Sequence, residues 1–351
     1  MKKIGRQVLF IGTSECNPRN GEGAFIQLSG GGIMYAFTEY VGDSWSDDAS
    51  ANISAVVSYD CGETWTDRRV LLYRDAGASN FMSVSLVNML NGDIGLFYLR
   101  KDKKSGGCTM YLVRSEDDGR TWSNPVRCLD EEGYFVTNND RVIRLQSGKL
   151  IYPINRHVIT NVFGKGELNF VVSEDDGRTW HKMLDENIHI PAEHKSTTGL
   201  QETGVFQYDD GMLWAWSRTD FGCQYECFSQ DEGKTWTVPE PNPFFSSPPS
   251  PMLVKRTGQC VAAVFNPIPN YTTRDLSGTW GRSPYICAVS KNGGKTFEQT
   301  YYLEDDFNNG YCYPAIFSGE DYFLVGYYHS AGSGVCLNST RITKVYYSEL
   351  S

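Results

Sequence analysis

Short apolar segments recur along the whole chain and are separated by polar turn residues. One set, three to five residues long, directly follows turns that contain glycine. Its members are residues 33–37, 94–98, 150–152 and 212–216. A second set of similar length covers residues 53–57, 110–113, 170–172 and 286–289. Segments of this length bounded by turn residues are typical of β-strands, and helical periodicity is nearly absent. The pattern predicts an all-β protein.

One octapeptide recurs just after such segments. Four copies share Ser-x-Asp-x-Gly-x-Thr-Trp, and a fifth, worn copy has Asn and Phe in place of Asp and Trp. They occupy residues 58–65, 115–122, 173–180, 229–236 and 290–297. The copies begin 56 to 61 residues apart, so one supersecondary unit is repeated. The Asp can accept backbone N–H bonds, the Gly permits a positive φ, and the Trp can pack against the neighbouring unit. We therefore interpret the octapeptide as a structural hairpin and not as a metal or substrate site.

The repeat predicts the architecture. Each period holds about four short strands, and the chain contains about six periods. Four-stranded sheets repeated around an axis form a β-propeller, so we predict a six-bladed β-propeller. The sixth unit is expected within residues 310–347, and a strand at residues 6–11 is expected to join it and close the ring. Because no Pro- or Ser-rich linker interrupts the chain, residues 1–351 are expected to form one domain.

Composition narrows the partners and the setting. The formal net charge is −10 and no basic residues cluster, which argues against nucleic acid as a partner. No segment is long enough to cross a membrane as a helix, and no signal peptide is visible at the N-terminus. The 10 cysteines include no C-x-x-C pair, so we expect free thiols and a cytoplasmic protein. No motif indicates a cofactor or a metal, and the sequence does not predict the oligomeric state.

The octapeptide is similar to the Asp-box of the sialidase superfamily, and the strand phasing extends this resemblance over nearly the whole chain. The resemblance implies a propeller with Asp-box hairpins and a glycan or sugar substrate. It also implies an Asp acid/base, a Tyr nucleophile assisted by a Glu, and three Arg that hold the substrate carboxylate. Because the Asp-box also occurs in propellers without hydrolase activity, function has to be argued from the site residues.

Three residues match the catalytic positions that the resemblance implies. Asp48, or its neighbour Asp47, lies in the loop before the first octapeptide, where the acid/base is expected. Glu202 precedes an Asp-Gly turn in mid-chain, as the Glu of sialidases does. Tyr311 lies at the start of the last unit and is the predicted nucleophile, with Tyr313 as the alternative.

The arginine positions match less well. Glu22 occupies the slot of the first arginine, and Arg19 lies nearby but out of register. Arg282 matches the third position, whereas the stretch before the fourth octapeptide has no arginine and Arg218 lies earlier. Loss of one partner of such an ion pair costs roughly 2–5 kcal/mol, and Glu22 would repel a carboxylate. Ordinary sialic acid is therefore a poor candidate substrate unless Arg19, Arg141 or Arg218 supplies the missing contacts.

Polar residues also open the strands that are expected to line the propeller axis. Asp140 and Arg141 do so in the third unit, at the phase of Glu202 in the fourth and Ser83 in the second. We predict that these residues face an axial sugar-binding site; the alternative is a water-filled channel.

Three functions remain open at this point. The first is a sialidase-like exo-glycosidase that uses Asp48, Glu202 and Tyr311. The second is a non-sialic exo-glycosidase that uses two carboxylates among Glu22, Asp48 and Glu202. The third is a non-catalytic carbohydrate- or protein-binding propeller, in which the catalytic trio would not converge in space.

Overall fold

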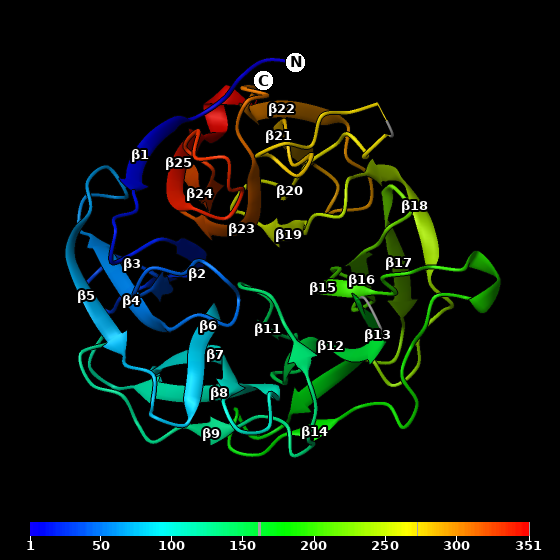
Figure 1. Cartoon of the computed structure of the whole chain (residues 1–351), viewed down its shortest axis with the longest axis horizontal. Coiled ribbons are helices and arrows are strands. Elements are labelled where there is room, and N and C mark those ends of the chain that lie inside the picture. The colour runs from blue at the N-terminus through cyan, green and yellow to red at the C-terminus, as the bar shows by residue number, and fades with distance from the viewer. Residues whose placement is uncertain (161–162, 272, 351) are drawn as a thin grey trace.

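Six antiparallel sheets form blades around a central axis (Figure 1), as the repeat predicts. The computed structural model describes residues 1–160, 163–271 and 273–350. From the axis outward, the first blade contains β2 (Asn20–Gln27), β3 (Ile33–Tyr40), β4 (Ala51–Ser58) and β5 (Thr66–Leu72). The second blade contains β6 (Ala78–Asn88), β7 (Ile94–Asp102), β8 (Cys108–Ser115) and β9 (Val126–Arg127). The third blade contains β10 (Phe135–Val136) with β11 (Ile143–Arg144), β12 (Leu150–Thr160), β13 (Phe163–Ser173) and β14 (His181–Lys182).

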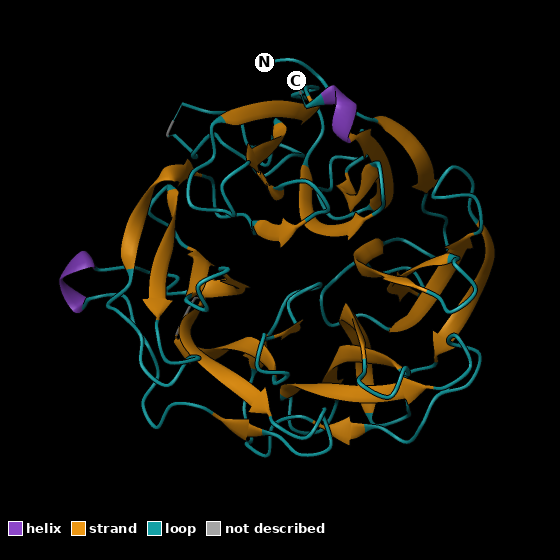
Figure 2. Cartoon of the chain, turned by 180° about the vertical axis from the view of Figure 1, so that it is seen from behind, coloured by secondary structure: helices purple, strands orange, loops and turns teal. Residues whose placement is uncertain are grey.

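The other three blades follow the same order from the axis outward. The fourth blade contains β15 (Gln201–Gln207), β16 (Leu213–Arg218), β17 (Cys223–Ser229) and β18 (Glu240–Ser246). The fifth blade contains β19 (Leu253–Arg256), β20 (Val261–Phe265), β21 (Tyr285–Ser290) and β22 (Gln299–Glu304). The sixth blade contains β23 (Tyr311–Ser318), β24 (Tyr322–His329), β25 (Ser339–Tyr346) and β1 (Arg6–Ile11). Two 3-10 helices, η1 (Ala192–His194) and η2 (Tyr347–Glu349), lie at the periphery of the ring (Figure 2).

The first and last strands of the chain close the ring. β1 pairs antiparallel with β25, with Arg6 opposite Lys344 and Ile11 opposite Thr340. The sixth blade therefore combines the two ends of the chain, which confirms the role predicted for residues 6–11. No helix within the described residues is both long and apolar enough to span a bilayer.

The octapeptides form hydrogen-bonded turns at the outer strands. In the first copy, Asp60 Oδ1 accepts the backbone N–H of Thr64 at 2.8 Å, and Asp60 Oδ2 accepts its hydroxyl at 2.6 Å. The Gly62 N–H donates to Ser58 Oγ at 2.8 Å. The fourth and fifth copies repeat the pattern around Asp231 and Asn292. These contacts satisfy the turn itself, which confirms a structural role for the motif.

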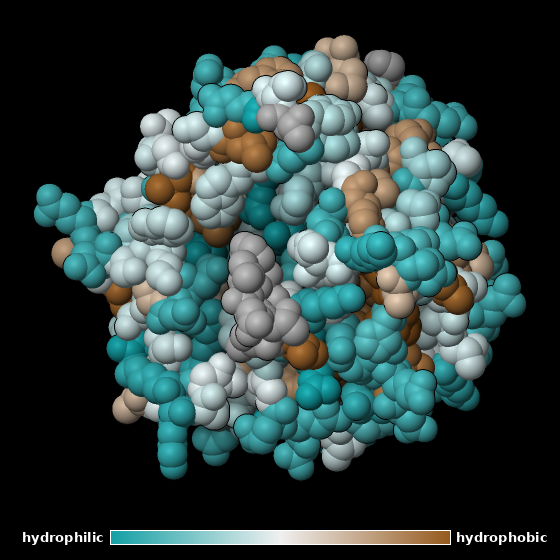
Figure 3. Space-filling model, turned by 45° about the vertical axis from the view of Figure 1, so that its right-hand side comes forward, coloured by the Kyte–Doolittle hydropathy of each residue, from teal (hydrophilic) through white to brown (hydrophobic). Residues whose placement is uncertain are grey.

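The aromatic residue of each octapeptide packs into the core between blades. Trp236 of the fourth blade stacks on Phe170 of the third, with ring centroids 4.2 Å apart, and Trp180 of the third blade packs edge-on against Phe97 of the second at 5.8 Å. Such contacts between adjacent blades form a series of apolar clusters around the ring. The face in Figure 3 is mostly hydrophilic, with apolar residues in separate small patches.

Four of the innermost strands carry a β-bulge at the same place. Glu22, Ser83, Glu202 and Tyr313 each lie five residues before the last residue of their strand. Their φ angles are 53°, 57°, 51° and 56°, and the pairing register shifts around each of them. A positive φ in a non-glycine residue costs of order 1–3 kcal/mol and re-aims the side chain. The repeat therefore places one redirected side chain from each of four blades near the axis.

Candidate active site

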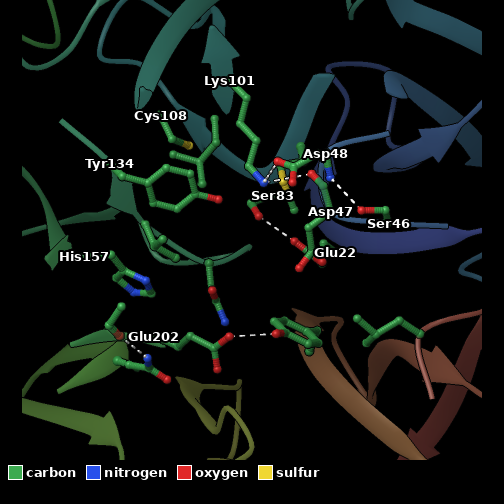
Figure 4. Close-up of a pocket in the computed structure, with 18 of the residues that line it drawn as sticks. Glu22, Ser46, Asp47, Asp48, Ser83, Lys101, Cys108, Tyr134, His157 and Glu202 are labelled. Atoms are coloured by element: carbon green, nitrogen blue, oxygen red, sulfur yellow. Dashed lines mark hydrogen bonds and ion pairs between the residues drawn. The ribbon is translucent and has the colours of Figure 1, made fainter. Parts of the chain in front are cut away.

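The redirected side chains meet in a pocket of about 850 Å³ at the inner strands. All four bulge residues, Glu22, Ser83, Glu202 and Tyr313, line it. The loop between β3 and β4 supplies further lining residues, among them Asp47 and Asp48. Figure 4 shows carboxylates from the first and fourth blades directed into the same space. The pocket is thus built from residues far apart in the sequence but equivalent in the repeat.

Tyr313 and Glu202 form a hydrogen-bonded pair inside the pocket. The Tyr313 hydroxyl donates to Glu202 Oε1 at 2.6 Å, and Arg218 Nη1 lies 2.7 Å from the other oxygen, Oε2. Burial raises the pKa of Glu202, but Arg218 and Arg282 outweigh it, so the net shift is downward. Burial, and then the charge of Glu202, raises the pKa of Tyr313 well above its ordinary value. The pair is therefore a neutral phenol held by an ionised carboxylate.

Tyr311 does not take part in this arrangement, which corrects the predicted nucleophile. Its side chain is buried outside the pocket, and its hydroxyl donates to the backbone oxygen of Asp306 at 3.1 Å. Its ring stacks on Tyr285, with centroids 6.1 Å apart. Tyr311 of β23 pairs regularly with His329 of β24, and the register shift begins only after the next residue. The bulge thus directs Tyr313, the alternative candidate, into the pocket.

The first blade contributes two carboxylates that share one guanidinium. Arg19 Nη2 lies 2.7 Å from Glu22 Oε1, and Arg19 Nη1 lies 2.5 Å from Asp47 Oδ1. Arg19 also donates from Nε to the Tyr328 hydroxyl at 2.8 Å, so its polar atoms are engaged within the protein. Ser83 donates its hydroxyl hydrogen to Glu22 Oε2 at 2.5 Å. Arg19 itself does not line the pocket, whereas Glu22 does.

The two carboxyl groups that pair with Arg19 have pKa values shifted in opposite directions. Burial raises the pKa of Glu22 more than Arg19 and Ser83 lower it, and the charges of Asp47 and Glu202 raise it further. Partial desolvation raises the pKa of Asp47, but Arg19 more than compensates, so the net shift is downward. Neighbouring carboxyl groups with pKa values pushed apart are typical of acid/base sites.

Asp48 points away from this pair. Its side chain is 83% exposed, and its Oδ1 lies 3.3 Å from Lys101 Nζ. Lys101 also donates to the backbone oxygen of Asp47 at 2.8 Å, which anchors the loop. Of the two candidates for the acid/base, Asp47 pairs with Arg19, the partner of Glu22, and Asp48 lies near Lys101 (Figure 4).

Arg282 lines the pocket without a carboxylate partner among the described residues. Its guanidinium lies 5.4 Å from the ring centroids of both Trp280 and Tyr313. Nη1 donates to Cys312 Sγ and Nη2 to the backbone oxygen of Pro249, both at 3.2 Å. Within the described part of the chain, Nε has no hydrogen-bond partner. Of the predicted arginines, Arg218 and Arg282 therefore reach the pocket.

Asp140 and Arg141 lie outside the pocket, contrary to the prediction. Asp140 accepts hydrogen bonds from Lys255 Nζ at 2.7 and 2.8 Å, and Arg141 Nη2 donates to the backbone oxygen of Met252 at 2.6 Å. Both residues thus connect the third blade to the fifth. The inner strand of the third blade is broken into β10 and β11, and its positive φ falls four residues before the end of β11 instead of five. Asn138 of the same segment lines the pocket instead.

Several pocket residues were not singled out as candidates from the sequence. Lys101 and Tyr134 face each other, with Nζ 5.3 Å from the ring centroid, and burial raises the pKa of Tyr134 to about 12. His157 also lines the pocket, and burial lowers its pKa, which favours the neutral ring. The sequence offers one signal for this part of the pocket. Lys101 lies near the end of the apolar strand β7, and a buried lysine needs charged or polar partners.

Comparisons with known proteins establish the family. A family model described as a BNR repeat-like domain matches residues 44–329. The chain belongs to this family. It is 27% identical over 221 residues to a sialidase of Bacteroides fragilis (strain YCH46), a match that covers 59% of this chain and 37% of that protein. The BNR repeat-like chain is thus a divergent member of the sialidase superfamily. The match covers little more than a third of the length of the Bacteroides fragilis protein.

Solved structures agree on the fold of this BNR repeat-like protein. A protein of unknown function from Dyadobacter fermentans DSM 18053 superposes with a TM-score of 0.75 at 17% identity, covering 97% of this chain and 99% of that one. The Hadza microbial sialidase Hz136 gives a TM-score of 0.72 at 16% identity, covering 95% of this chain and 66% of that one. At these identities the likeness concerns the fold. Among the described residues, no three His, Cys, Asp or Glu side chains gather as a metal site.

Proposed function

We propose that this protein is a sialidase-like exo-glycoside hydrolase that removes a terminal sugar from a glycan or glycoconjugate with retention of configuration. The observation that carries the proposal is the 2.6 Å hydrogen bond from the Tyr313 hydroxyl to Glu202 Oε1 in the pocket. A phenol is a weak nucleophile until an adjacent base takes its proton, and Glu202 is placed to do so. The family membership supports the same reaction class.

In the first step, the Tyr313 oxygen attacks the anomeric carbon while its proton passes to Glu202. The bond from the anomeric carbon to the leaving oxygen breaks, and an acid donates a proton to that oxygen. In the second step, a water molecule gives one proton to the deprotonated acid and its oxygen displaces Tyr313 from the same carbon, and Tyr313 takes its proton back from Glu202. Two displacements at one carbon retain the configuration. Arg218 and Arg282 keep Glu202 ionised in the free protein, as a base requires.

We assign the acid/base role to Asp47 and not to Asp48. Both side chains are exposed, Asp47 at 62% and Asp48 at 83%, but Asp47 shares its partner Arg19 with Glu22, whereas Asp48 contacts Lys101. In the free protein the pKa of Asp47 is lowered. A bound sugar that displaces water from the carboxyl group would raise this pKa toward the value that a general acid needs.

A two-carboxylate mechanism is the second candidate because of Glu22. This residue is buried and its pKa is raised by that burial, which is the property of a general acid. In that mechanism Glu22 would protonate the leaving oxygen, Glu202 would attack the anomeric carbon or activate water, and Tyr313 would only position Glu202.

The test is turnover of a panel of aryl glycosides by the wild type, Tyr313→Phe and the matched variant Tyr311→Phe. The panel contains α-sialosides, other keto-acid sugars, uronic acids and neutral sugars. We expect kcat to fall by about 10³-fold or more in Tyr313→Phe and to stay near wild type in Tyr311→Phe. Mass spectrometry after reaction with a 2-fluoro or 3-fluoro glycosyl fluoride should find the sugar on the peptide that contains Tyr313.

Two results would decide against the proposal. Turnover that survives in Tyr313→Phe would transfer the chemistry to Glu22 and Glu202. A wild-type protein that binds sugars without cleaving any member of the panel would favour a carbohydrate-binding propeller.

A further inference from the structure

The first-blade wall of the pocket offers hydrogen-bond acceptors. Glu22 and Asp47 line the pocket with carboxyl groups, and both are balanced by the single guanidinium of Arg19. When both carboxyl groups are ionised, this trio carries a net charge of one negative unit. The Glu22 side chain is fixed by Arg19 on one oxygen and by Ser83 on the other, so it cannot turn away from the pocket without breaking these bonds. A group that contacts this wall must therefore donate hydrogen bonds.

Donors without partners lie on other walls of the same pocket. Arg282 is 4% exposed and Asn138 is 3% exposed. Among the described residues, Arg282 Nε and Asn138 Nδ2 have no hydrogen-bond partner, and both side chains line the pocket. A buried donor without a partner destabilises the protein unless a ligand or water accepts its hydrogen bond. Both side chains bring donor groups to the pocket lining, and a ligand that also accepts hydrogen bonds suits them.

We propose, building on the glycosidase function above, that the terminal sugar is uncharged and that Glu22 selects it by accepting hydrogen bonds from its hydroxyl groups. A hydroxyl group both donates and accepts, so a neutral sugar satisfies both kinds of wall. A carboxylate only accepts and meets a net negative wall at Glu22 and Asp47. An ammonium group only donates and leaves Arg282 and Asn138 unmatched. A neutral sugar therefore meets the wall of Glu22 and Asp47 without the repulsion that a carboxylate placed there would meet.

The experiment compares kcat/KM for aryl glycosides of galactose, glucose and fucose with that for an aryl α-sialoside. Wild type, Glu22→Gln and the exposed matched control Glu116→Gln are measured side by side. We expect the wild type to prefer a neutral glycoside by at least about tenfold. Loss of the charged acceptor in Glu22→Gln should lower kcat/KM for that glycoside by about 10-fold to 150-fold. The ratio of kcat/KM for the neutral glycoside to kcat/KM for the sialoside should therefore fall in Glu22→Gln, and Glu116→Gln should match the wild type on both substrates.

A second variant guards against a folding defect in Glu22→Gln, because that change also removes the ionic partner of Arg19. Ser83→Ala keeps the Arg19 ion pair and frees only Glu22 Oε2. It should reduce neutral-glycoside turnover more than sialoside turnover, and both variants are checked by thermal unfolding.

The failure of this inference differs from the failure of the proposed function. Preferred cleavage of the sialoside, abolished in Tyr313→Phe, would overturn the substrate class and keep the hydrolase. If no glycoside is cleaved, saturation-transfer NMR with free galactose, glucose, fucose and N-acetylneuraminic acid still decides the class. Stronger binding of N-acetylneuraminic acid, or binding unchanged by Glu22→Gln, would overturn the role of Glu22.

Discussion

Glu22 and Glu202 occupy the same position in two different blades and have opposite pKa shifts. Each lies at a bulge with positive φ, five residues before the end of its innermost strand. Burial dominates at Glu22 and raises its pKa, whereas Arg218 and Arg282 outweigh burial at Glu202 and lower its pKa. One structural position thus holds carboxyl groups with different protonation behaviour, as an acid/base site requires.

Stability should depend on pH in opposite directions at these two residues. The pKa of Glu202 is lower in the folded state, so its ionised carboxylate stabilises the fold above the pKa of the unfolded state. This stabilisation is lost as pH falls, and the wild type should lose stability relative to Glu202→Gln below about pH 4.5. The pKa of Glu22 is higher in the folded state, so its carboxyl group stabilises the fold at low pH, where it is protonated. This stabilisation is lost as pH rises, and the wild type should lose stability relative to Glu22→Gln as pH rises from about 4.5. Thermal unfolding from about pH 3 to about pH 8 measures both differences; parallel pH slopes for the two variants would contradict this account.

Tyr311→Phe should affect stability and leave the pocket unchanged. The variant loses the hydrogen bond from the Tyr311 hydroxyl to the Asp306 backbone oxygen. The expected loss is about 1 kcal/mol of unfolding free energy, since the ring packing remains. Denaturant titration checks the stability and sugar binding checks the pocket; a binding defect comparable to that of Tyr313→Phe would show that Tyr311 acts in the site.

The effects of Asp47→Asn and Asp48→Asn on the rate should depend differently on the leaving group of the substrate. If Asp47 protonates the leaving oxygen, Asp47→Asn should slow glycosides with a poor, alkyl leaving group by about 10²–10⁴-fold. Aryl glycosides with acidic phenols need less protonation and should be affected less. Asp48→Asn should change both substrate types by a similar, small factor, because Asp48 is exposed and contacts Lys101. The reverse order of effects would assign the role to Asp48.

Arg282→Lys should weaken substrate recognition, whereas Arg141→Lys should weaken the fold. Arg282 lies between Trp280 and Tyr313 in the pocket, and lysine reproduces neither its planar shape nor its donors. We expect kcat/KM to fall by about 10-fold to 150-fold. Arg141 lies outside the pocket, and burial lowers its pKa to about 10. Its variant should show a lower Tm and an unchanged KM; a raised KM in Arg141→Lys would place that residue in substrate binding.

The octapeptides should tolerate Asn but not Ala at the aspartate. Asn292 already makes the turn, with its Oδ1 accepting from the Thr296 N–H at 3.0 Å and its Nδ2 donating to the Thr296 hydroxyl at 2.8 Å. Asp175→Ala loses the corresponding bonds to Thr179 and should cost about 1–2 kcal/mol, while Asp175→Asn should cost less. Urea unfolding measures both, and equal losses would show that the side-chain bonds contribute nothing.

The sequence predicts the fold far better than it predicts the site. The spacing of the octapeptide predicts the number of blades because the chain holds about six such periods, and Glu202 precedes a recognisable turn. The sequence favours Tyr311 over Tyr313 because the sequence of β23 does not reveal where its bulge begins. The position of Asp140 is not visible in the sequence for a related reason, since the inner strand of the third blade is broken into β10 and β11.

The pairing of β1 with β25 has a consequence for bound ligands. The two ends of the chain pair in the sixth blade and close the ring, and Arg19 of the first blade donates a hydrogen bond to the Tyr328 hydroxyl of the sixth. Glu22 and Tyr313 lie on the two sides of this junction. A ligand that touches both residues would therefore hold the ring closed, and a saturated protein should resist proteolysis and opening of the ring for longer than the free protein.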